Sequence, residues 1–110
     1  MEKEKTPELF VRDLLLSYNK QKPICSNDIA NMLNLKYEKE VPWRSSDIRN
    51  IVNRLRRLEI PVIANSKGYF ISYNEDDIIN QIQSLQKRVD AISAANDGMK
   101  AVYNTINKLK

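Results

Sequence analysis

The chain has no histidine, a single cysteine and only two glycines among its 110 residues, and these shortages exclude several kinds of site. Without histidine there is no imidazole to act as a catalytic base, and one thiol cannot supply a Cys/His zinc site or a disulfide framework. A phosphate-cradling loop needs clustered glycines, whereas Gly68 and Gly98 lie far apart. We therefore expect no catalytic residues, no cofactor and no metal, in a protein that is not an enzyme.

Hydrophobic runs long enough to span a membrane are also missing, and the charged residues 1–5 are not followed by the apolar core of a signal peptide. The one thiol, Cys25, suits a reducing compartment. These features predict a cytoplasmic protein with no membrane association.

Positive charge is concentrated in one short segment. The 18 basic and 14 acidic residues give a net charge of +4, and all of it arises in residues 44–72, since the two flanking segments are each neutral. Abundant lysine, asparagine and isoleucine indicate an AT-rich genome, so arginine is the better indicator of a basic surface. Five of the seven arginines lie in this segment: Arg44, Arg49, Arg54, Arg56 and Arg57. Localised positive charge is typical of a nucleic-acid-binding surface.

Capping signals and hydrophobic spacing predict two helices in the first part of the chain. Thr6 and Pro7 begin a helix that ends near Tyr18. Ser26 is the predicted N-cap of a second helix, which covers about residues 27–34.

A third helix follows, with Ser45 or Ser46 as its N-cap. It ends near Glu59, because Pro61 disfavours helical backbone in the residue before it. Its hydrophobic residues recur at helical spacing and form an apolar stripe that should face the core: Ile48, Ile51, Val52, Leu55 and Leu58.

The hydrophobic period then changes to that of strands. Residues 61–64 and 69–71 are β-prone runs, separated by a polar turn at 65–68 that contains a glycine. This pattern predicts a hairpin. The short apolar pair at 24–25 predicts one or two further residues of strand.

The C-terminal part predicts a long helix with a heptad pattern. Asn74 is its N-cap, and the acidic residues 75–77 match the positive end of its dipole. An asparagine at one a position is a device that fixes register and favours two strands. The expected dimerisation residues are Ile78, Ile82, Leu85, Val89, Ile92, Asn96 and Met99, and the pattern continues through Tyr103 and Ile106. Two alternatives stay open: a turn at 96–98 that folds the helix back, and packing of this seam on the chain's own domain.

This order of elements resembles a winged helix-turn-helix domain. The resemblance rests on the helix start at 26–30, the apolar stripe at 48–58 and the turn and strand at 65–71. The Lys-Gly-Tyr step at 67–69 is similar to the wing of biotin-repressor-type DNA-binding domains and of small phage-encoded winged-helix proteins. The connection between the second and third helices is long for a helix-turn-helix. The resemblance does not extend to the biotin-ligase domain of the repressor, so that activity is not carried over.

The resemblance implies a mainly α fold with a small β-hairpin. It divides the chain into a winged helix-turn-helix domain over residues 1–73 and a coiled-coil-like dimerisation helix over residues 74–110.

A DNA contact surface follows from the third helix. With the apolar stripe against the core, polar side chains fall on the open face, where arginine can bind a guanine edge and asparagine an adenine edge. Serine hydroxyls and a helix N-terminus suit phosphates. The expected DNA-binding residues are Arg44, Ser45, Ser46, Arg49, Asn50, Asn53, Arg54, Arg57 and, at the hairpin tip, Lys67.

These observations predict a small phage or mobile-element protein, in the cytoplasm of a host bacterial cell, that binds double-stranded DNA as a homodimer. Helix 46–58 would enter the major groove, and the protein would be a transcriptional regulator or a replication accessory. The alternative is a phage-encoded interaction module that binds and inhibits or recruits a host replication, transcription or defence protein. Two narrower questions also stay open: whether the arginine-rich face is only a solvated surface, and whether Trp43 packs internally or stacks on a nucleotide. Asp76 and Asp77 are adjacent carboxylates without a complementary base, which disfavours an enzyme.

Overall fold

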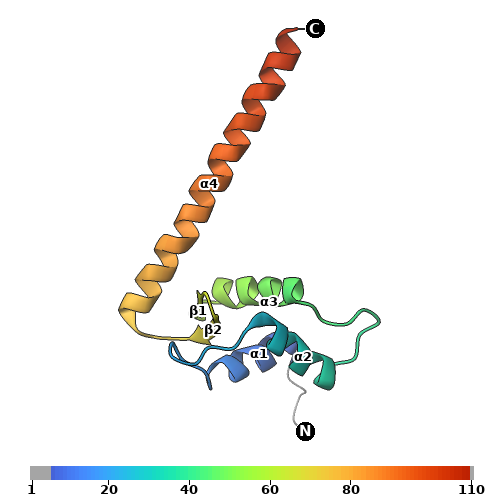
Figure 1. The fold of residues 1–110 in the computed structure, drawn as a ribbon, viewed down its shortest axis with the longest axis vertical. Helices are drawn as coiled ribbons and strands as arrows, with labels where there is room; N and C mark the ends of the chain where they lie inside the picture. The colour runs from blue at the N-terminus through green and yellow to red at the C-terminus, as the bar shows by residue number, and fades with distance from the viewer. Residues whose placement is uncertain (1–5, 110) are drawn as a thin grey trace. The chain divides into compact units, whose positions relative to one another are not determined.

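The computed structural model describes residues 6–109, and the charged start of the chain discussed above lies outside them. The described part is mainly helical, with one small antiparallel hairpin and a long C-terminal helix (Figure 1). In chain order the elements are α1 (Pro7–Leu15), α2 (Ser26–Lys36), α3 (Ser45–Arg57), β1 (Val62–Asn65), β2 (Gly68–Ile71) and α4 (Glu75–Lys108). The chain divides into two compact units, Met1–Ile78 and Ile79–Lys110, so the first turn of α4 belongs to the first unit.

The first helix begins as predicted and ends earlier. The Thr6 hydroxyl accepts a hydrogen bond from the Leu9 N–H at 3.3 Å, which confirms Thr6 as the N-cap. Regular α-helix stops at Leu15 and not near Tyr18, because the next turn tightens: the Ser17 and Tyr18 N–H groups donate to carbonyls three residues back.

The predicted N-caps of the next two helices, Ser26 and Ser45 or Ser46, are wrong by one or two residues. Cys25 occupies the N-cap of α2, so Ser26 is already its first helical residue. Arg44 occupies the N-cap of α3, where its backbone N–H donates to the Asp47 carboxylate at 2.9 Å, and Ser45 is the first helical residue. A carboxylate in the first turn can thus organise the helix start when the N-cap side chain is not an acceptor.

The end of α3 is a Schellman motif. The Ile60 N–H donates to the Leu55 carbonyl at 3.1 Å, and the Glu59 N–H donates to the Arg56 carbonyl at 3.0 Å. Glu59 lies between these bonds in the left-handed region, with φ of 66°. The predicted end near Glu59 is therefore confirmed, and its geometry places a non-glycine residue where glycine is preferred.

The hairpin has the predicted position and a two-residue tip. Its strands pair from Val62–Ile71 to Asn65–Gly68, and the Asn65 side-chain oxygen accepts from the Lys67 and Gly68 N–H groups at 2.8 and 3.1 Å. A third segment joins its edge, because Ile24 and Tyr69 exchange two backbone hydrogen bonds of 3.0 and 2.8 Å. The short predicted strand at 24–25 is thus a single bridge.

The first unit has one hydrophobic core between α1, α2, α3 and the hairpin. Each side chain that is almost fully removed from water contributes about 1.5–3 kcal/mol of transfer free energy. The most buried members are Val11, Leu15, Ile29, Leu33, Ile48, Ile51, Val52, Leu55 and Val62. Leu58, predicted to complete the stripe of α3, is 65% exposed, because it is the C-cap and its backbone has already left helical geometry.

The C-terminal helix is uninterrupted. The Asn74 side chain accepts from the Asp77 N–H at 3.1 Å, which confirms Asn74 as the N-cap. Helical structure continues through residues 96–98 to Lys108, so the chain does not fold back there. Among the described residues, no helix combines the length and the hydrophobicity needed to cross a membrane.

Gly68 should tolerate no side chain. Its φ is +152°, and an ideal Cβ would lie 2.3 Å from the Ile24 carbonyl oxygen. Gly68→Ala therefore strains the backbone and breaks the bridge between Ile24 and Tyr69. We expect the free energy of unfolding in urea to fall by about 2 kcal/mol or more. Gly98→Ala is the matched control, because nothing lies within 4 Å of its added Cβ, and it should stabilise α4 by about 0.5–1 kcal/mol. Equal effects of the two substitutions would contradict this account of the hairpin.

Relief of the left-handed backbone at Glu59 should stabilise the protein. Glu59→Gly is expected to raise the free energy of unfolding by about 0.5–1 kcal/mol, since glycine adopts this φ without steric cost. Glu59→Ala removes the same charge and keeps the strain, so its unfolding midpoint should match that of the unchanged chain. A midpoint that rises equally in both variants would point to the charge and not the backbone.

Candidate nucleic-acid interface

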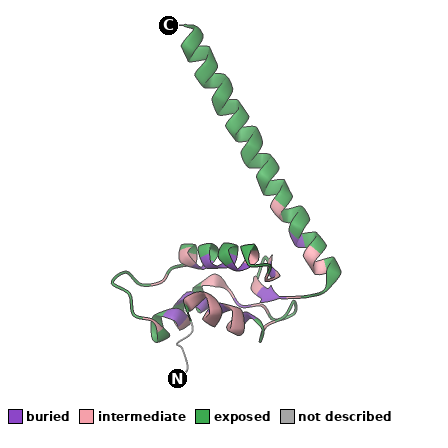
Figure 2. Cartoon of the chain, turned by 180° about the vertical axis from the view of Figure 1, so that it is seen from behind, coloured by how far each residue is buried: buried purple, intermediate pink, exposed green. Residues whose placement is uncertain are grey.

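The third helix has two sharply different faces. Its apolar side chains at 48, 51, 52 and 55 are at most 1% exposed, so the rotation of the helix about its axis is fixed. Of the exposed polar side chains of the helix, we name four the α3 polar face: Arg49, Asn50, Asn53 and Arg57. Figure 2 shows the same division, with buried residues toward the body of the first unit and exposed residues outward. None of the four side chains forms a hydrogen bond or ion pair with another described residue.

Two further arginines of α3 are used within the fold. The Arg54 guanidinium lies 2.9 Å from the Glu8 carboxylate, so this predicted DNA contact is an ion pair between α3 and α1. Arg56 donates from Nε to the Val62 carbonyl at 3.0 Å, which fastens α3 to the start of the hairpin. The arginines of residues 44–57 therefore separate into two that make contacts within the fold, Arg54 and Arg56, and three without such side-chain contacts among the described residues.

The N-terminal end of α3 is fixed to α2. The Ser45 hydroxyl donates to the Asn27 side-chain oxygen, so the first turns of the two helices meet at this point. Ser45 is thus engaged, whereas Arg44 and Ser46 are exposed beside it. This arrangement leaves one hydroxyl and one guanidinium accessible at the positive end of the helix dipole.

Lys67 is exposed at the tip of the hairpin. Its backbone is held by the Asn65 side chain, so the lysine projects from an ordered turn. Arg56 ties α3 to β1, and the hairpin tip and the α3 polar face belong to the same compact unit.

The long connection between α2 and α3 is closed by contacts that the sequence pattern did not indicate. Asn34 accepts from the Trp43 N–H at 2.7 Å and donates to its carbonyl at 3.2 Å. The indole N–H donates to the Tyr37 carbonyl at 3.2 Å, and Lys39 Nζ lies 3.8 Å from the centre of the ring. Trp43 is therefore half-buried and packs internally, and no local spacing signal links it to Asn34.

The predicted dimerisation residues lie along α4. Ile82, Val89, Ile92 and Met99 are 56–70% exposed, and Asn96 is exposed between them. Ile78 and Leu85 are half-buried.

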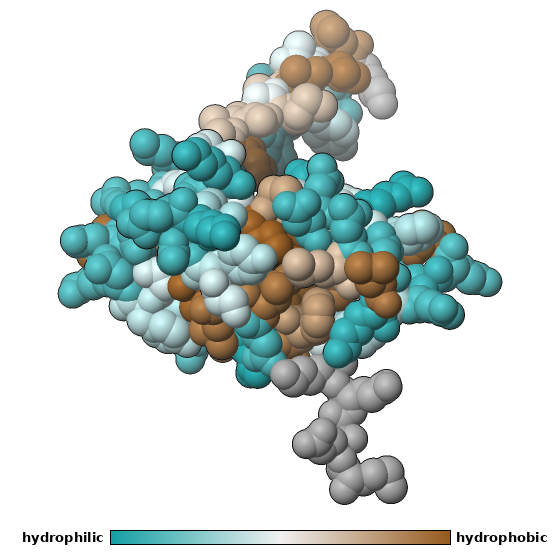
Figure 3. Space-filling view, turned by 60° about the horizontal axis from the view of Figure 1, so that its bottom comes forward, coloured by the Kyte–Doolittle hydropathy of each residue, from teal (hydrophilic) through white to brown (hydrophobic). Residues whose placement is uncertain are grey.

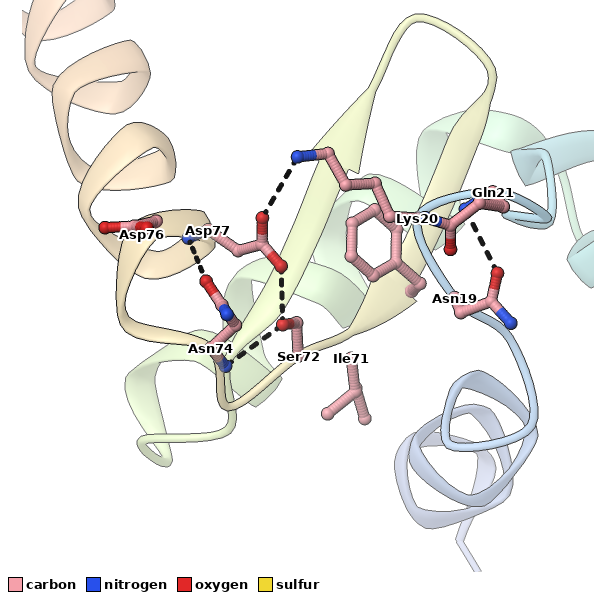
Figure 4. Close-up of a pocket in the computed structure, with 9 residues that line it drawn as sticks. Asn19, Lys20, Gln21, Ile71, Ser72, Asn74, Asp76 and Asp77 are labelled. Carbon is pink, nitrogen blue, oxygen red and sulfur yellow. Dashed lines mark hydrogen bonds and ion pairs between the residues drawn. The ribbon is translucent and has the colours of Figure 1, made fainter.

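A shallow cleft of about 460 Å³ lies between the 19–21 loop, the end of β2 and the start of α4 (Figure 4). The Asp77 carboxylate accepts from the Ser72 hydroxyl at 2.7 Å and lies 3.4 Å from Lys20 Nζ. These side chains, together with Asn74, make polar contacts at the start of α4. Within residues 6–109, no three or more Cys, Asp or Glu side chains are grouped so that they could hold a metal ion.

The candidate interface thus consists of the α3 polar face, Arg44 and Ser46 at the start of the same helix, and Lys67 at the hairpin tip. These seven residues carry four positive charges and include no acidic side chain. No protein-family model, curated protein or solved structure matches this chain.

Proposed function

We propose that this chain is a double-stranded DNA-binding protein whose first unit is a winged helix-turn-helix and whose α3 polar face enters the major groove. The observation that carries the proposal is that Arg49, Asn50, Asn53 and Arg57 face solvent on a helix whose opposite face is fully buried, and that their side chains have no partner within residues 6–109. Guanidinium and carboxamide groups are the side chains that read guanine and adenine edges.

The arrangement of the elements supports the same proposal. A helix, a bridging residue at Ile24, two helices and a hairpin follow one another, and the segment at Ile24 adds a third position to the small sheet. In a winged helix-turn-helix the hairpin is the wing, and Lys67 at its tip would contact the DNA backbone or minor groove. A transcriptional regulator or a replication accessory, encoded by a phage or mobile element, fits this description.

Dimerisation through α4 is the second part of the proposal. A monomer would leave the hydrophobic side chains of α4 in water along much of its length. Two copies that pair through this helix would present two α3 polar faces, which is the usual way in which small helix-turn-helix proteins gain affinity for one site.

A host protein is the second candidate partner, and one observation favours it. Leu35 at the end of α2 is 90% exposed, and Val41 in the following loop is 56% exposed. The side of the first unit that carries α1 and α2 displays hydrophobic side chains among hydrophilic ones (Figure 3). If this surface carries the function, binding of a host protein should survive Arg49→Ala with Arg57→Ala and be lost on Leu35→Asp.

DNA binding is tested by mobility shift with a random-sequence duplex pool at low and at physiological salt. We expect binding that weakens as salt rises, because bound arginines release counterions from the DNA. Arg49→Ala with Arg57→Ala should lower the affinity about 30-fold or more, since each arginine contact contributes about 1 kcal/mol or more.

The matched control is Lys87→Ala with Lys108→Ala, which removes the same charge from exposed positions of α4. It should leave the affinity within about twofold, as expected for charges that lie outside the proposed contact. Equal losses of affinity in the two double variants would show that binding depends only on the net charge of the protein and not on the α3 polar face. The absence of binding at low salt would contradict the proposal.

Dimerisation is tested by sedimentation at micromolar concentration. The full chain should sediment as a dimer, and Ile92→Asp should raise its dissociation constant about 100-fold or more, because each chain would place an unpaired carboxylate in the apolar contact. Asp90→Ala alters a neighbouring exposed residue and should leave the dimer intact. A monomeric full chain would contradict this part of the proposal.

A further inference from the structure

Most of the large hydrophobic residues of α4 recur in a regular heptad repeat along one seam. We define the seam by its a positions and its d positions. The a positions are Ile82, Val89, Asn96 and Tyr103, and the d positions are Leu85, Ile92, Met99 and Ile106. Because α4 is one uninterrupted helix, these eight residues lie along one side of it.

The outer part of α4 has no cover within its own chain. Every residue from Gln86 to Leu109 is exposed, and the segment includes Gly98 and β-branched residues of low helix propensity (Figure 2). An isolated helix of this kind is marginal in water, since helices gain most of their stability from packing of an apolar face. The seam therefore needs an occupant.

We propose that the occupant is a second copy of the same helix, parallel and in register, so that Asn96 faces Asn96 of the second copy. In a parallel pair a residues meet a residues, and the two carboxamides can hydrogen-bond to each other. In an antiparallel pair a residues meet d residues. Full overlap of the seam would then place Asn96 against Ile92 of the second copy, and a shift by one heptad would place it against Leu85 or Met99. In each of these antiparallel registers, the Asn96 carboxamide of both chains lies against a hydrophobic side chain and lacks a hydrogen-bond partner.

The positions that flank the seam agree with the parallel pairing. In that arrangement each g residue lies beside the e residue five positions later in the second copy. Arg88 would lie beside Ser93, and Lys100 beside Ala95. No like charges meet across the seam, so nothing in the charge pattern opposes this register.

The direction of pairing decides what the dimer can bind. The first unit precedes α4 in the chain, so a parallel pair carries both first units at one end of the coil. An antiparallel pair with full overlap would separate their attachment points by more than the length of the seam, which is about 36 Å at 1.5 Å per residue. This consequence rests on the proposed function: a parallel dimer would bind one duplex at two half-sites related by two-fold symmetry, and would not bridge two separate duplexes.

Disulfide trapping tests the direction without DNA. In a Cys25→Ser background, Ile82→Cys and Ile106→Cys are prepared as separate full-length variants with tags of different size. Under mild oxidation each variant should form a disulfide with its own kind. In the mixture, the disulfide-linked 82–106 product should be at least about tenfold less abundant than either self-linked product. This ratio is expected because unpaired buried carboxamides disfavour the antiparallel pair.

A dominant 82–106 product would overturn the parallel arrangement. A monomer by sedimentation, with no disulfide in either variant, would overturn the second copy as occupant of the seam. The pair Val89→Cys and Met99→Cys gives the same readout at inner positions, so a variant that fails to fold does not decide the result.

Asn96→Ile isolates the contribution of the carboxamide. It should raise the thermal unfolding temperature and increase the mixed product about tenfold relative to the self-linked products, because the penalty on the antiparallel pair is removed. An unchanged product ratio would show that Asn96 does not set the direction.

Selection of duplexes from a random pool by the self-linked Ile82→Cys dimer separates the proposal that the chain binds DNA from the proposal that α4 pairs in parallel. An inverted repeat of two half-sites is expected. Failure to retain DNA, with self-linking intact, would overturn the proposed function and leave the direction standing. Recovery of isolated single half-sites would overturn the inference that both first units of the dimer bind one duplex.

Discussion

The burial of one face of α3 is the constraint on which the rest of the first unit depends. Four side chains at helical spacing are almost entirely removed from water, so the helix has only one rotation that satisfies the core. That rotation places Arg49, Asn50, Asn53 and Arg57 in solvent. The exposed pattern of arginine and asparagine is therefore a consequence of packing.

The basic segment has a divided role. Arg54 and Arg56 connect α3 to Glu8 and to the Val62 carbonyl, and the remaining basic side chains make no such contacts among the described residues. Exposed ion pairs such as Arg54–Glu8 contribute about 0.2–1 kcal/mol, so this contact orients α1 and α3 more than it stabilises them. Charge counted along the sequence overstates the accessible positive surface, and the contacts within the fold show which arginines remain for a partner.

Local signals predicted much of this fold, and tertiary contacts explain where they were wrong. Thr6, Asn74 and the turn at 65–68 act as the sequence indicates, because each is satisfied by backbone groups within three residues. The predicted caps at Ser26 and at Ser45 or Ser46 were displaced because an N-cap is defined by backbone geometry, and the extended residue before each helix is Cys25 or Arg44. The Arg54–Glu8 ion pair and the Asn34–Trp43 hydrogen bonds join residues whose proximity arises only from packing. The α3 polar face was predicted because helical period alone determines it, whereas its function remains a proposal.

The most direct test of the central claim is an NMR titration of the full chain with duplex DNA at low salt. The account predicts that amide and arginine side-chain resonances shift along 44–57 and at the hairpin tip around Lys67, and that resonances of residues 86–109 stay in place. Shifts confined to α4 or to the Leu35 and Val41 surface, or no shifts at low salt, would contradict the claim that the α3 polar face binds DNA.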